Sequence, residues 1–293
     1  MNSGVYAAGL AYVCWGLFPL YFHRLSQISA VELIFHRSVW ALLCLVLVLS
    51  ARRQWAWLGP AMRSPRTVAT YAASAFLLSI NWVLYVWSVH NGHVVEAALG
   101  YFINPLFNVL LGVLVLHERP RRLQWAALAV AAAGVAWLGA VAGSPPWIAL
   151  GLAASFGAYG LLKKTAPLGA LEGLTTETLL MAPVAIPALL WLGTHGGDTA
   201  QADAITWIWL LLAGPITAAP LLLFGYGAQR VSMATLGLLQ YISPSLQFLL
   251  GVLIFREPMQ PARLIGFALI WGALMLYSAE TLWQRRQLRL QAV

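Results

Sequence analysis

Long apolar stretches follow one another along almost the whole chain, separated by short segments that carry proline, glycine or charged residues. A helix needs about 20 predominantly apolar residues to cross the hydrocarbon core of a bilayer. The pattern therefore predicts ten transmembrane helices. They are expected at residues 4–23, 31–50, 67–89, 93–116, 122–142, 147–164, 174–193, 204–227, 232–255 and 262–283.

Composition supports a membrane protein and excludes a soluble globule. Of the 293 residues, 61% are hydrophobic and 9% are charged, which leaves too little polar material to cover a water-exposed surface. A spanning chain must be helical or a closed barrel, and these apolar runs are far longer than the roughly 10 residues of a barrel strand. The fold class is therefore an all-α integral membrane protein that has the lipid bilayer as its main partner.

The basic residues indicate the orientation of the helices rather than a nucleic-acid partner, although the net charge is +8. They stand in short runs between apolar segments. With the N-terminus in the cytoplasm, thirteen lie on the inner side and three on the outer side, which agrees with the positive-inside rule. The inner residues are Arg52, Arg53, Arg63, Arg66, Arg119, Arg121, Arg122, Lys163, Lys164, Arg230, Arg285, Arg286 and Arg289, and the outer ones are Arg24, Arg256 and Arg263. Both termini are expected in the cytoplasm.

The chain contains an internal duplication. Ile103–Gly112 (INPLFNVLLG) aligns with Ile242–Gly251 (ISPSLQFLLG), and Glu118 matches Glu257 at the same offset along the chain. Weaker matches at nearly the same offset pair Trp15-Gly16 with Phe156-Gly157, and Glu32 with Glu172.

The number of spans in each copy determines how the two copies are oriented. Five spans is an odd number, so the second copy enters the membrane upside down relative to the first. The expected domains are a five-helix repeat over residues 1–142, an inverted five-helix repeat over residues 147–283 and a basic cytoplasmic tail over residues 284–293. Inverted repeats are typical of carriers that work by alternating access.

Several short motifs add a family resemblance that covers nearly the whole chain. They are Trp15-Gly16, Glu32, His36–Trp40 (HRSVW), Asn91–Ala97 (NGHVVEA), Gly100–Pro105 (GYFINP) and Gln240–Pro244 (QYISP). With these the chain resembles the drug/metabolite transporter superfamily, its EamA group and, within that group, the RarD-type permeases, often called chloramphenicol-sensitive proteins. The stretch from Asn91 to Pro105 is the most specific part.

This resemblance implies ten helices with both ends in the cytoplasm and a central cavity between the halves. It also implies transport of small metabolites, often amino acids or drugs in the outward direction, across a bacterial inner membrane. The resemblance names no substrate for this chain and implies no cofactor.

Three ionisable residues near the outer end of the second span are candidates for transport, and two of them, His36 and Arg37, are expected to line the cavity. Glu32 and His36 share a helix face at i, i+4 spacing, and Arg37 follows directly. An ionisable group in hydrocarbon is costly unless it is paired or hydrated. Arg37 is therefore either a substrate carboxylate anchor or one partner of a gating ion pair with Glu32 or Glu96. The alternative is a snorkelled residue that fixes the helix at the interface.

The fourth and ninth spans carry matching polar stripes beside a proline. Pro105 and Pro244 are expected to break their helices near the membrane midplane, where transporter sites tend to lie. The candidates that line a cavity there are Asn104, Asn108, Gln240 and Gln247, together with Tyr101 and Tyr241 of the family-like motifs. The alternative is that these amides hold helices together.

Other spans could complete the cavity with aromatic and polar side chains. The candidates are Trp15, Asn81, Tyr85 and Tyr159. The alternative for each aromatic residue is a place in the interfacial belt of a membrane protein. Lys163-Lys164 is interpreted as a signal for the inner face.

The function predicted from these features is secondary transport of a small molecule by alternating access. Glu32, His93 and Glu96 are the candidates for gating or proton coupling. A channel and a non-transporting receptor or scaffold are the alternatives. No Ser-His, His-Glu-x-x-His or paired-Asp pattern and no nucleotide-binding glycine loop is present in the sequence, so neither an enzyme nor an ATP-driven pump is expected. No metal site is expected either.

Overall fold

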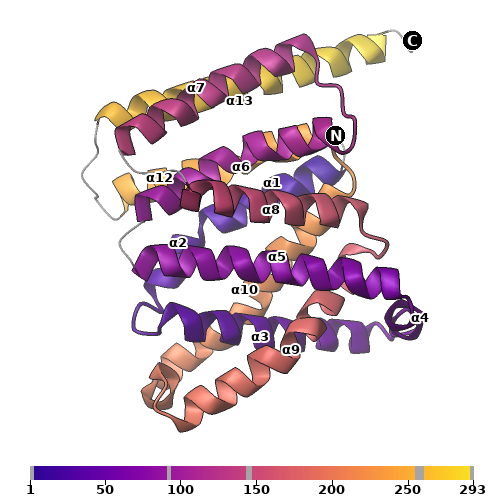
Figure 1. Ribbon diagram of the computed structural model, residues 1–293, viewed down its shortest axis with the longest axis vertical. Helices are drawn as coiled ribbons and strands as arrows, with labels where there is room; N and C mark the ends of the chain where they lie inside the picture. The colour runs from indigo at the N-terminus through magenta and orange to yellow at the C-terminus, as the bar shows by residue number, and fades with distance from the viewer. Residues whose placement is uncertain (1–2, 91–93, 143–146, 255–260, 291–293) are drawn as a thin grey trace.

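The computed structural model describes residues 3–90, 94–142, 147–254 and 261–290, and over these residues the chain is helical with no strand. Figure 1 shows the arrangement. The elements are α1 (Ser3–Gly16), α2 (Phe18–His23), α3 (Ala30–Ala51), α4 (Leu58–Arg63), α5 (Pro65–His90), α6 (Val94–Leu114), α7 (Arg122–Ala142), α8 (Trp147–Thr165), α9 (Ala170–Thr194), the 3-10 helix η1 (Asp198–Gln201), α10 (Ala204–Ala228), α11 (Met233–Gln240), α12 (Ile242–Leu253) and α13 (Pro261–Leu290).

The all-α membrane fold expected from the sequence is confirmed. Within the described residues, each of the ten expected spans coincides with one helix or with one broken pair of helices. Six stretches there are long and apolar enough to cross a membrane on length and composition alone. Two differences stand out: α4 was not expected, and α13 continues to Leu290, so residues 284–290 of the expected tail extend the last helix.

Local sequence explains where several helices begin. Ser29, Asp203 and Ser232 each precede a helix and accept a hydrogen bond from the backbone N–H three residues later. The bonds from Thr206 hold the pKa of the exposed Asp203 carboxyl below its usual value.

Large apolar side chains point away from the bundle, among them Leu190 and Leu253 at 67% and 70% exposure, as expected of surfaces in contact with lipid tails.

Helix packing follows the inverted repeat. The counterparts are α1 and α8, α3 and α9, α5 and α10, α6 and α11–α12, and α7 and α13. Helix α1 packs on α10, and its counterpart α8 packs on α5, the counterpart of α10. In the same way α8 packs on α6, and α1 packs on α11 and α12, the counterparts of α6. Three helices pack against their own counterparts, namely α3 on α9, α6 on α11 and α7 on α13. This exchange of partners is the packing expected of two halves related by a pseudo-two-fold axis.

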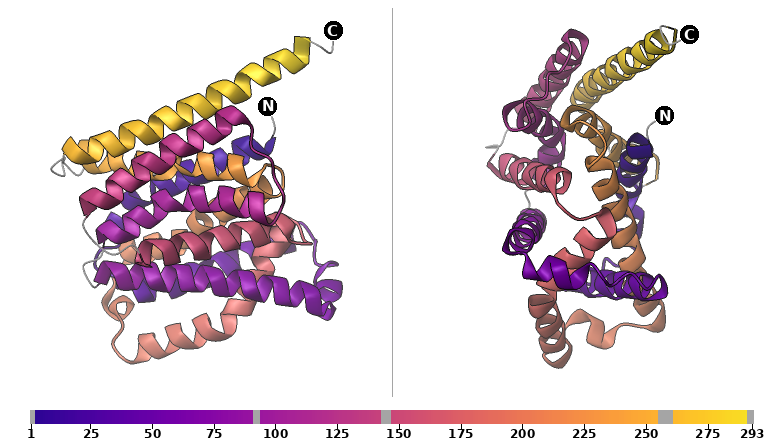
Figure 2. Two further views of the ribbon diagram at one scale, coloured as in Figure 1. Left: turned by 45° about the horizontal axis from the view of Figure 1, so that its top comes forward. Right: turned by 90° about the vertical axis from the view of Figure 1, so that its right-hand side faces the viewer.

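Close backbone approaches hold two of these counterpart pairs together. A Cβ at Gly134 of α7 would lie 2.9 Å from the carbonyl oxygen of Gly266 in α13, and a Cβ at Gly237 of α11 would lie 2.5 Å from that of Pro105 in α6. Small residues at these contacts let the helices approach one another, as is common in membrane bundles. Helices α7 and α13 lie side by side at one edge of the bundle (Figures 1 and 2).

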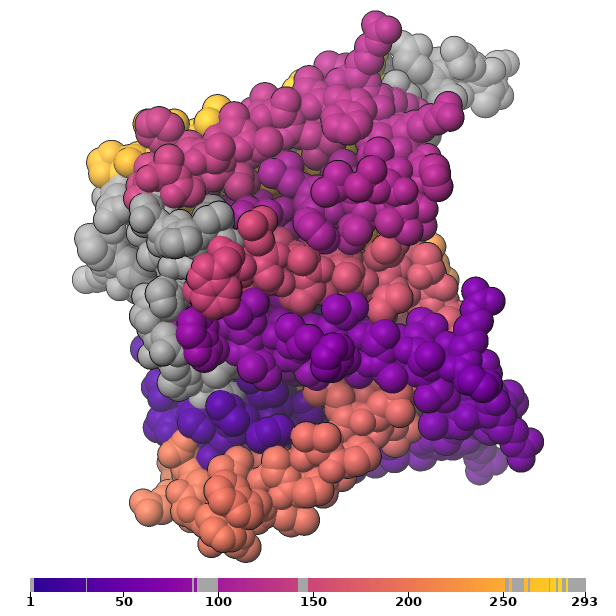
Figure 3. All heavy atoms as spheres, viewed as in Figure 1, coloured from indigo at the N-terminus to yellow at the C-terminus, as the bar shows by residue number. Residues whose placement is uncertain are grey.

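The two ends of the bundle carry different parts of the chain. Both termini lie at the end that α4 also occupies, here called the terminal end, and the connection from α2 to α3 lies at the opposite end (Figure 1). Side chains fill the space between α5 and α8 on the face seen in Figure 3.

Two of the described spans are broken, and one of them, the ninth, was expected to be. The first span breaks at Leu17, where α2 begins with Pro19 in its first turn, and the ninth breaks at Tyr241, three residues before Pro244. The expected break at Pro105 is wrong, since α6 continues through that residue from Val94 to Leu114. A proline inside a helix removes one hydrogen bond, and the packing of α6 on α8 and α11 keeps the helix continuous.

Candidate functional site

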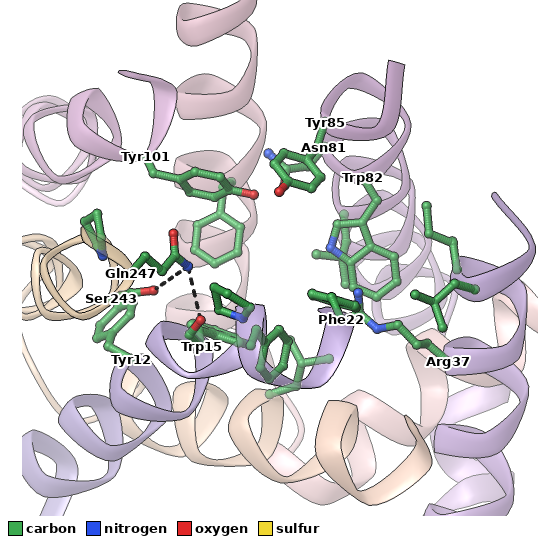
Figure 4. Close-up of a pocket in the computed structure, with 18 of the residues that line it drawn as sticks. Tyr12, Trp15, Phe22, Arg37, Asn81, Trp82, Tyr85, Tyr101, Ser243 and Gln247 are labelled. Atoms are coloured by element: carbon green, nitrogen blue, oxygen red, sulfur yellow. Dashed lines mark hydrogen bonds between the residues drawn. The ribbon is translucent and has the colours of Figure 1, made fainter. Parts of the chain in front are cut away.

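A cavity of about 510 Å³ lies between the two repeats (Figure 4). It reaches the α2–α3 connection through Leu25, Ser26 and Ile28, so it approaches the end of the bundle opposite the termini. Both repeats line it. From the first repeat these are Tyr12, Trp15, Phe18, Pro19, Phe22, Leu33, Ile34, Arg37, Leu78, Asn81, Trp82, Tyr85 and Tyr101, and from the second Phe156, Leu221, Gln240, Ser243, Pro244 and Gln247.

Arg37 of α3 supplies the positive charge of this cavity lining. Its Nε donates a hydrogen bond of 3.0 Å to Thr217 Oγ1 of α10. The guanidinium carbon lies 4.5 Å from the ring centroid of Trp82 and 5.5 Å from that of Phe22, so aromatic faces flank the charge. An arginine held in this way is stabilised inside the bundle, and its planar fork suits carboxylate or phosphate groups.

Hydroxyl groups of two tyrosines face one another in Figure 4, and their ring centroids lie 5.8 Å apart. They are Tyr85 of α5 and Tyr101 of α6, both among the residues expected from the sequence to line a cavity. Across the cavity, Gln247 donates to the carbonyl oxygen of Trp15 at 3.1 Å and to Ser243 at 3.4 Å. That amide ties the broken ninth span to the first helix beside the break at Leu17.

Two other amides of the lining are used mainly to join helices. Asn81 of α5 donates to the carbonyl oxygen of Leu152 at 3.0 Å and to Ser155 at 2.9 Å, both in α8. Gln240 of α11 accepts a bond of 2.9 Å from Asn108 of α6. The bonding favours the interpretation that these amides hold helices together, while Asn81 and Gln240 still face the cavity.

Five expected cavity residues lie elsewhere: His36, Asn104, Asn108, Tyr159 and Tyr241. The two asparagines are 1% exposed within the bundle. Tyr159 stacks on Phe224 with centroids 5.9 Å apart, and Tyr241 is buried among the side chains of α7 and α13. A helical stripe predicts the face on which a side chain lies but not which neighbour covers it, so the sequence could not separate lining from packing residues.

Glu32 and His36, the two ionisable candidates that share a helix face beside Arg37 in the second span, are engaged with other partners. His36 accepts a bond of 3.2 Å from Trp40 Nε1 and packs edge-on against Trp207. Glu32 is 1% exposed and accepts bonds from the backbone N–H groups of Asp198 at 2.8 Å and Thr199 at 3.1 Å, and also from the Thr199 hydroxyl. Glu32 therefore anchors η1, and in the described part of the chain it forms no ion pair with Arg37.

His93 lies outside the described residues, and the side chain of Glu96 does as well. Their proposed part in gating or proton coupling stays a prediction. Among the described residues no group of three or more potential metal ligands occurs.

An ion pair that the sequence reasoning missed lies deeper in the bundle. Lys163 Nζ of α8 is 3.0 Å from Glu177 Oε2 of α9, and the two side chains are 3% and 1% exposed. Lys163, which the sequence suggested only as a signal for the inner face, thus also points into the bundle as one partner of this pair. Glu177 could have been found as an ionisable residue within the expected span 174–193.

An aromatic layer separates the cavity from this pair. Trp15, Phe156, Phe224 and Tyr159 contact one another, with neighbouring ring centroids 5.4–5.9 Å apart. Trp15 and Phe156 line the cavity, while Lys163 lies 5.7 Å from the ring of Tyr159 on the other side. The cavity thus ends in the middle of the bundle and is covered towards the terminal end.

Comparison with known proteins agrees with these features. The model of the EamA-like transporter family matches residues 2–140 and 145–279. The chain is 48% identical to Protein RarD of Streptomyces exfoliatus, over 95% of this chain and 89% of that one, and 41% identical to the uncharacterized transporter YojE of Bacillus subtilis, over 97% and 96%. It is 39% identical to Protein RarD of Escherichia coli, over 98% and 97%. One solved crystal structure has the same fold, with a TM-score of 0.72, 20% identity and coverage of 94% of this chain and 97% of that one.

Proposed function

The chain belongs to the EamA-like transporter family and is a multi-pass membrane transporter, and from this premise we propose that it is a secondary carrier that moves a small molecule by alternating access. The proposed direction is export across a bacterial inner membrane, with both termini in the cytoplasm. The terminal end of the bundle is then the inner end, and the cavity of this conformation faces outward.

The observation that carries this proposal is a cavity that lies between two inverted halves, approaches the end of the bundle opposite the termini and is covered towards the terminal end. Its lining comes from both repeats, so a movement of one half against the other would change its access. The aromatic layer closes it towards the terminal end. A carrier needs one site that opens to either side of the membrane in turn. Two pseudo-symmetric halves can supply an outward-facing and an inward-facing conformation of similar structure.

The lining also supports a class of substrate. Arg37 offers the guanidinium group of the lining to an anionic group, Phe18, Phe22 and Trp82 offer aromatic faces around it, and Phe156 adds apolar surface to the cavity. We propose that the substrate carries a carboxylate or a similar anion beside an apolar or aromatic body, as an amino-acid-like or drug-like molecule does. The substrate gradient or a proton gradient would drive net movement.

The test compares metabolites in cells and in liposomes. Cells that overproduce the native protein, Arg37→Ala or Arg230→Ala at equal membrane abundance are compared by untargeted mass spectrometry of medium and extract. Arg230 is the matched control, because its guanidinium also lies over an aromatic ring, that of Tyr226 at 3.5 Å, yet it does not line the cavity. We expect an anion to be enriched in the medium with the native protein and Arg230→Ala but not with Arg37→Ala.

The enriched compound is then measured in liposomes that contain the purified protein. Counterflow of labelled compound that saturates supports the carrier, whereas flux that does not saturate supports a channel. Binding without flux would support a receptor or scaffold. Equal enrichment with Arg37→Ala and the native protein would contradict the role of Arg37 as the anchor.

A further inference from the structure

Lys163 and Glu177 form an ion pair, and neither residue lines the cavity. Lys163 Nζ lies 3.0 Å from Glu177 Oε2, and Ser74 of α5 donates its hydroxyl to the other carboxylate oxygen. The rings of Tyr71 and Tyr159 lie 5.8 Å and 5.7 Å from the ammonium group. The pair thus joins α8, α9 and α5, and every charged atom in it has a partner.

Its place in the bundle is towards the terminal end, beyond the aromatic layer. Lys164, the next residue, donates to the carbonyl oxygen of Val231, and a Cβ at Gly4, beside the N-terminus, would lie 2.6 Å from the Cβ of Arg230. Lys163 itself packs near Gly225 of α10. The pair therefore lies between the cavity and the terminal end, where three helices of the second repeat meet α5 of the first.

The inverted repeat relates this pair to Arg37. Glu177 stands at the same offset from Arg37 as Glu172 does from Glu32. Both side chains are bound by a hydroxyl group of a crossing helix, since Arg37 donates to Thr217 of α10 and Glu177 accepts from Ser74 of α5. Helices α5 and α10 are themselves counterparts. The same position in the two halves therefore carries a charge, and it faces the cavity in one half and is closed off in the other.

We propose that the Lys163–Glu177 pair, together with its bond to Ser74 of the first repeat, is the gate that closes the inner end of the transport pathway and that this contact among α8, α9 and α5 opens when the carrier faces inward. This inference rests on the alternating access proposed above. An ion pair suits a contact that must break in every cycle, because separated charges recover hydration from the entering water. Apolar side chains have no comparable gain, since exposing them to water is unfavourable.

A second ion pair in the same protein provides a control. Glu280 of α13 is also buried, at 4% exposure, and its Oε1 lies 3.4 Å from Arg121 Nη1. It stands in the layer of α7 and α13 and does not line the cavity. Glu280→Gln therefore removes a buried paired carboxylate without touching the proposed gate.

The experiment measures from which side the cavity is reached. Cys14 and Cys44 are replaced by serine, and Leu221 of the cavity lining is replaced by cysteine. Its reaction with a membrane-impermeant maleimide is followed in right-side-out and in inside-out vesicles, with the native pair, with Glu177→Gln and with Glu280→Gln. No substrate is required, so the result does not depend on identifying one.

We expect Glu177→Gln to raise the ratio of inner to outer labelling rates about tenfold or more, because removing one partner of a buried pair strongly destabilises the closed arrangement. Glu280→Gln should leave the ratio unchanged. If Glu177→Gln does not reach the membrane, the double variant Lys163→Met with Glu177→Gln leaves no unpaired buried charge and should raise the ratio in the same sense. An unchanged ratio in the variant that is present overturns the gate.

Failure of the gate can be told from failure of the carrier. Saturable counterflow by the native protein together with an unchanged labelling ratio would leave the carrier in place and remove the gate. Flux that does not saturate would reject alternating access itself.

Discussion

Replacing Glu32 by glutamine is expected to release the segment that joins α9 to α10. In the native protein the two carboxylate oxygens accept bonds from the backbone of Asp198 and Thr199 and from the Thr199 hydroxyl. Ser29, at the start of the same helix, donates its N–H to Asp198 Oδ2 at 2.7 Å. The start of α3 and the start of η1 therefore hold one another through reciprocal bonds.

The size of the effect follows from these bonds. A hydrogen bond to a charged group contributes about 1.5–3 kcal/mol. Glutamine keeps one acceptor oxygen and places an N–H₂ donor where Glu32 has its second acceptor, so at least one bond is lost. Since about 1.4 kcal/mol corresponds to a factor of ten, the segment should open about 10- to 100-fold more often.

Hydrogen–deuterium exchange followed by mass spectrometry measures this opening directly. Where opening limits exchange through its equilibrium, the rate for residues 195–203 should rise by the same factor. The control is Glu172→Gln, because Glu172 is the repeat counterpart of Glu32 and lies beside Gly169 at the other end of α9. That variant should leave exchange of the segment as it is in the native protein.

Equal exchange in Glu32→Gln and native protein would refute the reasoning, since it would mean that the carboxylate bonds do not hold η1. A similar increase in both variants would refute it as well, because the effect would then come from the loss of any acidic residue in this part of the bundle.

Two further predictions concern packing and capping. Gly237→Ala should destabilise the protein by about 1–3 kcal/mol, because its Cβ would lie 2.5 Å from the carbonyl oxygen of Pro105. Thermal unfolding measures this effect. The control is Gly59→Ala, which should be nearly neutral because no atom lies within 4 Å of its Cβ. Equal unfolding temperatures would contradict this. The pKa of Asp203 is lowered by its bonds from Thr206, so its stabilisation of α10 is present above the ordinary carboxyl pKa and is lost as the pH falls through the lowered value. Amide exchange at the start of α10 should increase in that acidic range, and Asp203→Asn should remove this dependence on pH.

Hydropathy predicted the membrane fold well because the bilayer imposes a fixed length and composition on each span. The aligned segments Ile103–Gly112 and Ile242–Gly251, with five spans in each copy, were enough to predict an inverted repeat, and the exchanged packing partners agree with it. The breaks were harder to place. Pro105 and Pro244 look alike in sequence, but of the two spans that carry them only the ninth is broken, because packing decides whether a proline interrupts a helix.

The sequence identified the charged residue of the site but could not separate the polar residues that line the cavity from those that join helices. Arg37 was found because a charge within an apolar span needs a partner or water. The same rule applied to Glu177 would have found the ion pair, but Lys163 beside Lys164 resembled a basic boundary. Asn108 could not be separated from residues such as Tyr85, because only the neighbouring helix decides whether a polar side chain meets another amide or open space.

The packing of α3 on α9, α6 on α11 and α7 on α13 resembles the isologous interface of a two-fold dimer, in which the same patch meets itself. The two identical subunits of such a dimer necessarily carry the same residue at every pair of symmetry-related positions. Joining the halves in one chain removes that requirement, so position 37 can hold arginine while its counterpart at 177 holds glutamate. A mutation near the axis of this protein therefore changes one of two related positions, and each half can be tuned without altering the other.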